Sequence, residues 1–331
     1  MSNGDNTVDL GDPQLTARVA EGVAAVEEML RAETNRGESF VSEKALHLTT
    51  AGGKRFRPIM ALLASEYGTQ PGSARVIKAA TSVEMVHVAT LYHDDVMDEA
   101  DRRRGVESAN SRWTNSVAIL AGDALLAHAS RLMSQLDTHT VEHFAETFEE
   151  LVTGQMRETI GAGEANPVEH YTAVIREKTA VLIASAAYLG AYHSGASAEH
   201  AATLKKIGAD VGMIFQIVDD IIDIFSAPED SGKTPGTDLR EGVFTLPVLY
   251  ALQEDSSVGA ELRGLLTGPL TDDAAVARAL ELLHASTGRA QALAAVQSYL
   301  DSVESALDTL PQNAATAALR HLAEYTVRRV G

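Results

Sequence analysis

Two clusters of aspartates are the residues of this sequence best suited to chemistry. Each cluster has the spacing i, i+1 and i+4 inside an apolar segment. The members are Asp94, Asp95 and Asp98 in DDVMD, and Asp219, Asp220 and Asp223 in DDIID. On an α-helix the first and third aspartates of such a cluster lie one turn apart on the same face. Carboxylates held this closely repel one another unless cations lie between them, so the duplicated spacing predicts two cation-binding helices.

The donor types decide which metal these helices would hold. If the two helices face each other, carboxylate oxygens surround one cavity, and such oxygens suit Mg²⁺, which also bridges phosphates. A di-iron site is the alternative, because Glu84 and His87 form one Glu-x-x-His motif. A ferritin-like bundle needs two such motifs and two further glutamates, and the sequence has no second motif. The absence of cysteine excludes thiolate metal sites, disulfides and a cysteine nucleophile.

Basic residues gather at two places in an otherwise acidic chain. They are Lys54, Arg55 and Arg57 in the segment GGKRFRP, and Arg102, Arg103 and Arg104 after the first aspartate cluster. Mg²⁺ at the carboxylates would bind one polyphosphate. Guanidinium and ammonium groups bind diphosphates directly, so these residues predict a second, separate anion site. For Arg55 and Arg102, solvated surface charge is the alternative interpretation.

Composition excludes several classes of protein. The 331 residues carry 27 Lys and Arg against 46 Asp and Glu, a net charge of −19, which disfavours nucleic acid as a partner. The 45% of hydrophobic residues is enough for a globular core. We expect a disordered tail over residues 1–12, no signal or transit peptide, and one domain over 13–331. The longest apolar stretch, 179–192, is shorter than the ~20 residues of a membrane span, so a cytoplasmic protein is expected.

Apolar residues recur at three- and four-residue spacing along nearly the whole chain, which predicts an all-α fold in a single large helical domain. The expected helices cover 13–34, a segment from about 42, 58–67, 73–99, 113–135, 138–160, 168–192, 198–226, 243–253, 257–266, 273–308 with a break near Gly288, and 312–329. No strand is predicted. The loop 226–242 is long and charged, which suggests a functional lid.

Sequence motifs distributed over most of the chain occur in a distinctive order. They are GGKRFRP at 52–58, DDVMD followed by RRRG at 94–105, EKTA at 177–180, and QIVDDIIDI with GTDLREG and TLP at 216–247. In this order and spacing they resemble the trans-isoprenyl diphosphate synthases. The resemblance implies the all-α isoprenoid synthase fold with a central cavity, usually as a homodimer. It also implies head-to-tail condensation of isopentenyl diphosphate onto an allylic diphosphate.

The resemblance implies roles for individual residues. The aspartates of both clusters would hold three Mg²⁺ ions, replaceable by Mn²⁺, on the allylic diphosphate, with Asp223 in an outer position. Isopentenyl diphosphate would be bound by Lys54, Arg57, His87 and Arg104. The allylic diphosphate would be contacted by Arg103, Lys178 and Lys233. The catalytic residues would be Lys178 together with Thr179 and Gln216, whose oxygens would stabilise an allylic cation.

The implied mechanism needs no protein nucleophile. Mg²⁺ and the basic residues would neutralise the departing diphosphate, so that the carbon–oxygen bond ionises. The isopentenyl double bond would then attack the allylic cation, with loss of a proton to the released diphosphate, in a cavity poor in water. One departure from the family pattern is Val243, where the family commonly has a lysine.

Product length would depend on side chains below the first aspartate cluster. Ala89 lies five residues before Asp94, ~7 Å along the helix, and Thr90 is next to it. Short-chain members of the family typically have a bulky aromatic at one of these positions. The small pair predicts a deeper floor, formed by Ser82, Met85 and Val86 or on a facing helix by Leu126, Ser130 and Met133. A product of C30 to C50 follows, with a C15 or C20 synthase as the alternative.

Three other functions remain open from the sequence. A class I terpene cyclase also ionises an allylic diphosphate at aspartates, but it does not need the second anion site indicated by GGKRFRP and Arg104. A non-catalytic subunit of a heteromeric synthase would be expected to have lost metal ligands. A structural helical scaffold leaves the six aspartates unexplained. A long prenyl product must leave toward lipid, yet no anchoring helix is evident.

Overall fold

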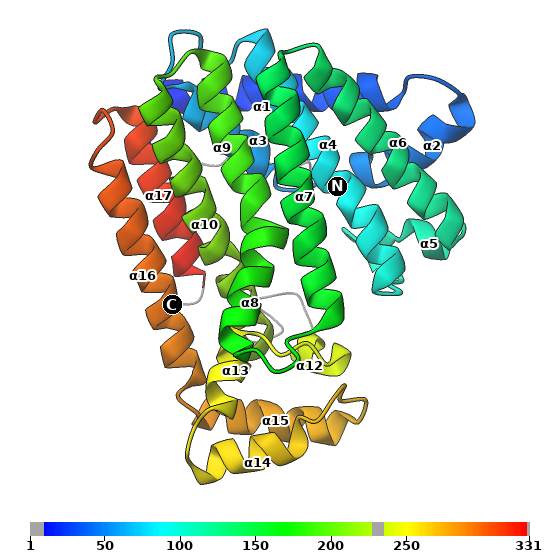
Figure 1. The fold of residues 1–331 in the computed structure, drawn as a ribbon, viewed down its shortest axis with the longest axis vertical. Coiled ribbons are helices and arrows are strands. Elements are labelled where there is room, and N and C mark those ends of the chain that lie inside the picture. Colours follow the sequence, from blue (N-terminus) through cyan, green and yellow to red (C-terminus); the bar gives the residue numbers. More distant parts are fainter. Residues whose placement is uncertain (1–9, 227–234, 330–331) are drawn as a thin grey trace. The chain divides into compact units, whose positions relative to one another are not determined.

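The computed structural model describes residues 10–226 and 235–329, and these are almost entirely helical (Figure 1). The predicted all-α fold is therefore confirmed. The chain forms two compact units. Unit 1 comprises residues 1–149, 182–208 and 310–319, and unit 2 comprises 150–181, 209–309 and 320–331, each within its described part.

Unit 1 is built around a buried helix, α4 (Ala74–Met97). Its other elements are α1 (Pro13–Thr34), α2 (Ser39–Thr50), α3 (Phe56–Ser65), the strands β1 (Arg102–Arg103) and β2 (Val106–Glu107), α5 (Ala109–Arg112), α6 (Asn115–Ser134), the first half of α7 (Thr138–Ile160), most of α9 (Val181–Ser194) and the start of α10 (Ala198–Phe225). The middle of α4 is buried on nearly every face, and it packs on α6, α3 and α1. This burial is what its apolar sequence predicts.

Small residues let the helices of unit 1 approach closely. A Cβ on Gly122 of α6 would lie 2.4 Å from the His93 ring of α4. A Cβ on Gly190 of α9 would lie 2.0 Å from the Ala61 carbonyl oxygen of α3. Among the described residues, α6 has the length and mean hydropathy of a membrane span. Its alanine-rich face packs against α4, so burial in the core of unit 1 explains much of its hydropathy.

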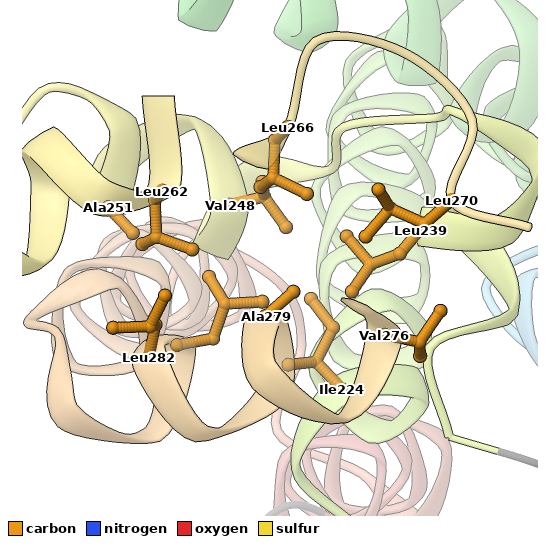
Figure 2. Packing of buried hydrophobic residues seen from close by; sticks show 11 residues of the cluster. Ile224, Leu239, Val248, Ala251, Leu262, Leu266, Leu270, Val276, Ala279 and Leu282 are labelled. Carbon is orange, nitrogen blue, oxygen red and sulfur yellow. The ribbon is translucent and has the colours of Figure 1, made fainter. Parts of the chain in front are cut away.

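Unit 2 contains the second aspartate cluster. Its elements are the second half of α7, α8 (Pro167–Ile175), a π-helical turn η1 (Arg176–Ala180), most of α10, α12 (Thr237–Glu241), α13 (Leu246–Leu252), α14 (Ser257–Leu265), α15 (Asp273–Ala285), α16 (Gly288–Leu307) and the end of α17 (Ala314–Arg328). Figure 2 shows Ile224, Leu239 and Val276 in one apolar cluster. Because Ile224 follows Asp223, this cluster fixes the end of α10 against α12 and α15.

The structure differs from the sequence expectations mainly at short elements. The expected helix 168–192 is α8, the η1 turn and α9, and the expected helix 273–308 is broken between α15 and α16, at the predicted place. The β1–β2 hairpin, α5 and α12 were not expected, because two to five residues carry too little periodicity. Of the expected disordered tail, residues 1–9 lie outside the described residues, whereas Leu10 is buried and Asp12 caps α1. Of the expected lid, 227–234 lies outside them too.

Two buried histidines join α7 to α9 within unit 1. The Nε2 of His143 lies 2.9 Å from Ser185 Oγ, and the Nε2 of His193 lies 2.9 Å from Thr140 Oγ1. Burial lowers the pKa of each imidazole to about 4. Both histidines are therefore neutral in the folded protein at pH 7.

We expect His143 and His193 to contribute a loss of stability as the pH falls from about 6.5 toward 4. In this range the histidines are protonated in the unfolded chain but stay neutral in the folded protein, because their folded pKa is lower. The free energy of unfolding therefore decreases by up to ~3 kcal/mol for each histidine. Urea titrations at pH 7.5, 6 and 5 measure this slope. His143→Gln should flatten it, and exposed His321→Gln should not. An unchanged slope in His143→Gln contradicts the assignment.

Candidate functional site

The first aspartate cluster ends α4. Asp94 and Asp95 lie in its last turn, and Asp98 is the C-cap, whose N–H donates to the Asp94 carbonyl oxygen at 2.8 Å. Asp95 is fully buried, and its Oδ1 accepts a hydrogen bond from Arg103 Nε at 2.6 Å. Its Oδ2 is buried without a hydrogen-bond partner among the described residues. Burial raises the pKa of Asp95, and Arg103 opposes this rise.

The cluster has the donor chemistry of a Mg²⁺ site. An unpartnered buried carboxylate oxygen is costly unless a cation binds it, and Asp95 Oδ2 is such an atom. All three side chains offer oxygen donors, which Mg²⁺ prefers. Within the described ranges, however, no three His, Asp or Glu side chains already converge on one point that could hold a metal ion. The fit to Mg²⁺ thus rests on the oxygen donors and on the unpartnered Asp95 Oδ2, and not on a preformed arrangement of three side chains.

A short hairpin directs the arginines that follow the cluster. The turn residues between β1 and β2, Arg104 and Gly105, both have positive φ, 52° and 78°. This is the pattern of a type I′ turn, in which glycine favours the second central position. The hairpin places Arg103 on Asp95, while Arg102 is exposed and donates to the Gly105 carbonyl oxygen. The surface interpretation of Arg102 agrees with this exposure.

Arg55 is buried, so its interpretation as solvated surface charge is wrong. Its Nη1 lies 2.9 Å from Oε1 of Glu84, a carboxylate of α4 that is only 2% exposed. Its Nε lies 3.1 Å from Oε1 of Glu27 on α1. Arg104 Nη2 lies 4.0 Å from the same Glu84 oxygen. One buried carboxylate thus anchors two guanidinium groups.

The C-terminal end of α2 provides further partners for the same arginines. Arg55 Nη2 donates to the Thr49 carbonyl oxygen at 3.0 Å, and Arg104 Nη1 donates to that of Leu48 at 3.1 Å. Carbonyl groups at a helix C-terminus lack helical partners and carry partial negative charge, so they favour cations. Both arginines adopt the left-handed backbone conformation, which costs a residue with a side chain strain. A Cβ on Gly53 would lie 3.2 Å from the guanidinium carbon of Arg104.

Arg57 and His87 lie beside this anchored pair. Arg57 Nε is buried and has no hydrogen-bond partner in the described part of the chain, and burial lowers the pKa of Arg57 to about 10. Burial and then the charges of Arg57, Arg104, Arg55 and Arg103 hold the pKa of His87 well below 6.5. Lys54 is exposed on the preceding turn. Clustered donors around a single carboxylate leave net positive charge, which suits a diphosphate.

In unit 2, the η1 turn carries Lys178 and Thr179. A Cβ on Gly154 of α7 would lie 2.8 Å from the Lys178 backbone nitrogen, so the glycine permits this close approach. Arg157 of α7 forms a bidentate pair with Glu177 at 2.9 and 3.1 Å, and Lys178 Nζ contacts Glu158. π-turns are frequent at functional sites because they shift side chains out of the α-helical register.

The three aspartates of the second cluster have different partners. Asp219 Oδ1 lies 2.7 Å from Arg329 Nη2. Asp220 is buried and accepts hydrogen bonds from Tyr171 and Gln216, and burial raises its pKa to about 7 against their effect. Asp223 Oδ2 accepts from the Asp238 N–H at 3.2 Å, which ties down the following segment.

The structure also locates the other predicted residues. Ala89, Met85 and Val86 are buried on α4, and Thr90 is half-buried. On α6, Met133 is buried, Leu126 is half-buried and Ser130 is exposed. Val243 is 43% exposed. The prediction for Lys233 lies outside the described residues.

Three residues that contact the predicted site were not identified from the sequence. Glu84 was considered only as an iron ligand, and its position three residues before His87, on the same helix face, could have linked it to the basic cluster. Tyr171 and Arg329 reach α10 from 49 and 110 residues away in sequence, and no local pattern signals such contacts.

Residues 38–283 match the family model described as polyprenyl synthetase. The matched range includes residues of both units. The chain is 51% identical to a nonaprenyl diphosphate synthase of Mycobacterium tuberculosis, over 98% of this chain and 97% of that protein.

Solved structures give the same result. The chain is 64% identical to a geranylgeranyl pyrophosphate synthase from Corynebacterium glutamicum complexed with calcium and isoprenyl diphosphate, with a TM-score of 0.91 over 98% of this chain and 100% of that one. It is 32% identical to a decaprenyl diphosphate synthase from Rhodobacter capsulatus, with a TM-score of 0.87 over 96% and 99%. These relatives differ in the length of the product that their names state.

The buried pair of Arg55 and Glu84 makes a stability prediction. Glu84→Gln leaves the Arg55 guanidinium without its charged partner, so we expect the free energy of unfolding to fall by ~3 kcal/mol. Adding Arg55→Gln should recover part of that loss, because the unpaired buried charge is removed. Chemical denaturation of both variants measures this, with exposed Glu21→Gln as the control. With Arg55→Gln alone as the third variant, a loss in the double variant equal to the sum of the two single losses would show that the pair is not coupled.

Proposed function

The chain belongs to the polyprenyl synthetase family and is a prenyl diphosphate synthase, and on that premise we propose that it makes an all-trans product of C30 to C50 in a Mg²⁺-dependent reaction. It would do so by adding isopentenyl diphosphate head-to-tail to an allylic diphosphate. The observation that carries this proposal is the basic cluster around Glu84, whose Arg57 Nε is buried without a partner among the described residues. A two-substrate synthase needs this second anion site, whereas a terpene cyclase does not.

The basic cluster would bind isopentenyl diphosphate. Arg57 and Arg104 would donate to its phosphate oxygens, while neutral His87 would donate one N–H and Lys54 would bind from the exposed turn. Because Arg55 is already paired with Glu84 and Glu27, its role is to hold the cluster in place. The strained backbone at Arg104 supports this proposal, since such strain persists where the surrounding contacts fix the conformation.

The aspartates would hold the metal ions on the allylic diphosphate. The proposed ligands are Asp94, Asp95, Asp98, Asp219 and Asp220, with Asp223 in an outer position. Members of the family depend on Mg²⁺, and we propose three ions, which Mn²⁺ can replace. Bound Mg²⁺ supplies positive charge that stabilises the departing diphosphate. The oxygen-only donor set and the unpartnered Asp95 Oδ2 support this assignment.

The protein's own residues would guide ionisation and coupling. Arg103 and Lys178 would bind the oxygens of the leaving diphosphate, so their positive charge stabilises the transition state. Thr179 and Gln216 would direct oxygen lone pairs toward the allylic cation. No side chain forms a covalent bond, and the apolar faces of the helices would keep water from the cation.

The small side chains of α4 support a long product. Ala89 lies five residues, ~7 Å along the helix, before Asp94 and does not block the path of a growing chain. Met85 and Val86, one turn further from the aspartates, are buried and could form the floor. The geranylgeranyl and nonaprenyl synthases that the chain resembles support a C20 and a long product respectively, and the small pair favours the longer one.

We further propose that the enzyme is a homodimer. α7 presents apolar side chains at intervals of three or four residues, and several are exposed in the single chain. The apolar side chains of this stripe are Val141, Phe144, Phe148, Val152, Met156 and Ile160, of which the two phenylalanines are half-buried. A second copy of the chain would cover this stripe by an isologous contact between two α7 helices.

The first measurement concerns the product. Purified protein with Mg²⁺, labelled isopentenyl diphosphate and each allylic primer from C5 to C20 should give a product ladder that ends at C30 or longer. Asp219→Ala should lower turnover at least ~100-fold, since a removed charged group at the transition state typically costs this much. Chromatography of the dephosphorylated products measures both. A ladder ending at C15 or C20 overturns the long-chain assignment, and a cyclic hydrocarbon from one substrate alone favours a cyclase.

The dimer is tested by mass. Sedimentation should give a particle near twice the 35.2 kDa of one chain. Val152→Glu combined with Met156→Glu places two charges in the stripe, so we expect monomers. Phe40→Glu, at an exposed apolar position on α2, serves as the control and should stay dimeric. A monomeric parent protein would refute the proposal.

A further inference from the structure

Four side chains of unit 2 form a continuous chain of hydrogen bonds. Tyr171 on α8 donates its hydroxyl proton to Asp220 Oδ2. Gln216, one turn before Asp220 on α10, donates from Nε2 to Asp220 Oδ1 at 2.9 Å. Thr179 on the η1 turn donates from Oγ1 to Gln216 Oε1 at 3.1 Å. Three separate elements are thus joined through one aspartate and one glutamine.

The carboxylate at the centre of this chain decides which way the Gln216 amide points. Tyr171 donates to Oδ2 of Asp220, which leaves Oδ1 as an acceptor, so the edge of the amide that faces Oδ1 is the NH₂ group. The amide oxygen then faces Thr179, whose hydroxyl proton it accepts. A reversed amide would place its oxygen against the Asp220 oxygen and lose that bond, while its NH₂ group would face Thr179, whose oxygen would then accept instead of donating. The orientation therefore follows from the network itself.

Tyr171 is the residue that fixes the carboxylate. Asp220 is 5% exposed and Tyr171 is 8% exposed, so water is largely excluded from their contact. Without the phenol, one buried oxygen of Asp220 would lose its donor, and such an oxygen turns toward any other donor within reach. Gln216 could supply the replacement donor with its second amide hydrogen or by rotating its side chain. The loss of Tyr171 would therefore change the orientation of the Gln216 amide.

The far end of the network presents oxygen. Thr179 has a single hydroxyl proton, and it is used on Gln216, so the lone pairs of Thr179 Oγ1 remain as acceptors. The Gln216 oxygen keeps a second lone pair as well. Both residues are half-buried, in contrast to Asp220 and Tyr171. A cation is stabilised by such partial negative charge, whereas an outward N–H or O–H would repel it.

We propose that Tyr171 is a positioning residue that, through Asp220, fixes the amide orientation of Gln216, so that the oxygens of Gln216 and Thr179 stabilise the allylic cation. The inference rests on the proposed prenyltransferase function and adds a residue on α8 to it. It leaves each Asp220 oxygen a further lone pair, so it is compatible with metal binding by Asp220.

The test separates a positioning role from a binding or purely structural one. Tyr171→Phe should lower kcat ~10- to 100-fold, the usual cost of one lost hydrogen bond to a charged group at a transition state. The KM values for both diphosphates and the Mg²⁺ concentration for half-maximal rate should stay within about twofold. Tyr325→Phe, at an exposed tyrosine of α17, is the matched control and should leave kcat unchanged.

A double-mutant cycle shows whether Tyr171 acts through Asp220. In the background Asp220→Asn the link is already altered, so adding Tyr171→Phe should slow turnover less than about twofold. Any contribution of Asp220 to metal binding is the same in both members of this pair and cancels. The pair also lacks an unpaired buried carboxylate, which keeps the comparison usable if Tyr171→Phe alone is unstable. If Tyr171→Phe lowers kcat by the same factor in the Asp220→Asn background as in the parent protein, the inference is overturned.

The outcomes also distinguish this inference from the function on which it rests. If the parent protein forms no prenyl product with any primer, the proposed function fails. If the parent is active and folded Tyr171→Phe retains at least half of its kcat, the positioning role alone is refuted.

Discussion

A single buried carboxylate organises the basic half of the proposed site. Glu84 lies in the buried middle of α4, and the guanidinium groups of Arg55 and Arg104 gather at one of its oxygens. Without this negative charge, several arginines could not lie close together away from water. The C-terminal carbonyl groups of α2 add partial negative charge at the same place. The cluster remains positive overall, because the two carboxylates of Glu84 and Glu27 are fewer than the basic side chains of Lys54, Arg55, Arg57 and Arg104.

This arrangement strains the backbone, and the strain lies at residues close to glycines in the sequence. Arg55 and Arg104 both take the left-handed conformation, and each is next to a turn that contains glycine. Gly53 leaves room for the Arg104 guanidinium, and Gly105 completes the hairpin turn. The two glycines therefore allow arginines from segments about fifty residues apart to meet at Glu84.

Unit 2 uses a different device, a polar chain fixed by an apolar core. Ile224 and Leu239 pack in the cluster that holds the end of α10, while Asp223 binds the backbone of the next segment. α10 is thereby fixed before its aspartates meet any ligand. Gln216 and Asp220, on the same face of this fixed helix, can then be oriented by Tyr171 and Thr179. Precise polar geometry depends on rigid packing, since hydrogen bonds are strongly directional.

Periodicity and motif spacing are local properties of the chain, so they were enough to predict the helical fold, the two aspartate clusters and the likeness to the prenyl synthases. The sequence predicted the residues of the basic cluster but left surface charge open as the alternative for Arg55, and it did not connect Glu84 or Tyr171 with the site. The burial of Arg55 and the contacts of Glu84 and Tyr171 follow from how the chain folds. Burial and partners depend on which distant segments meet, as Arg55 meets Glu27 and Glu84, and no spacing within one segment encodes such contacts.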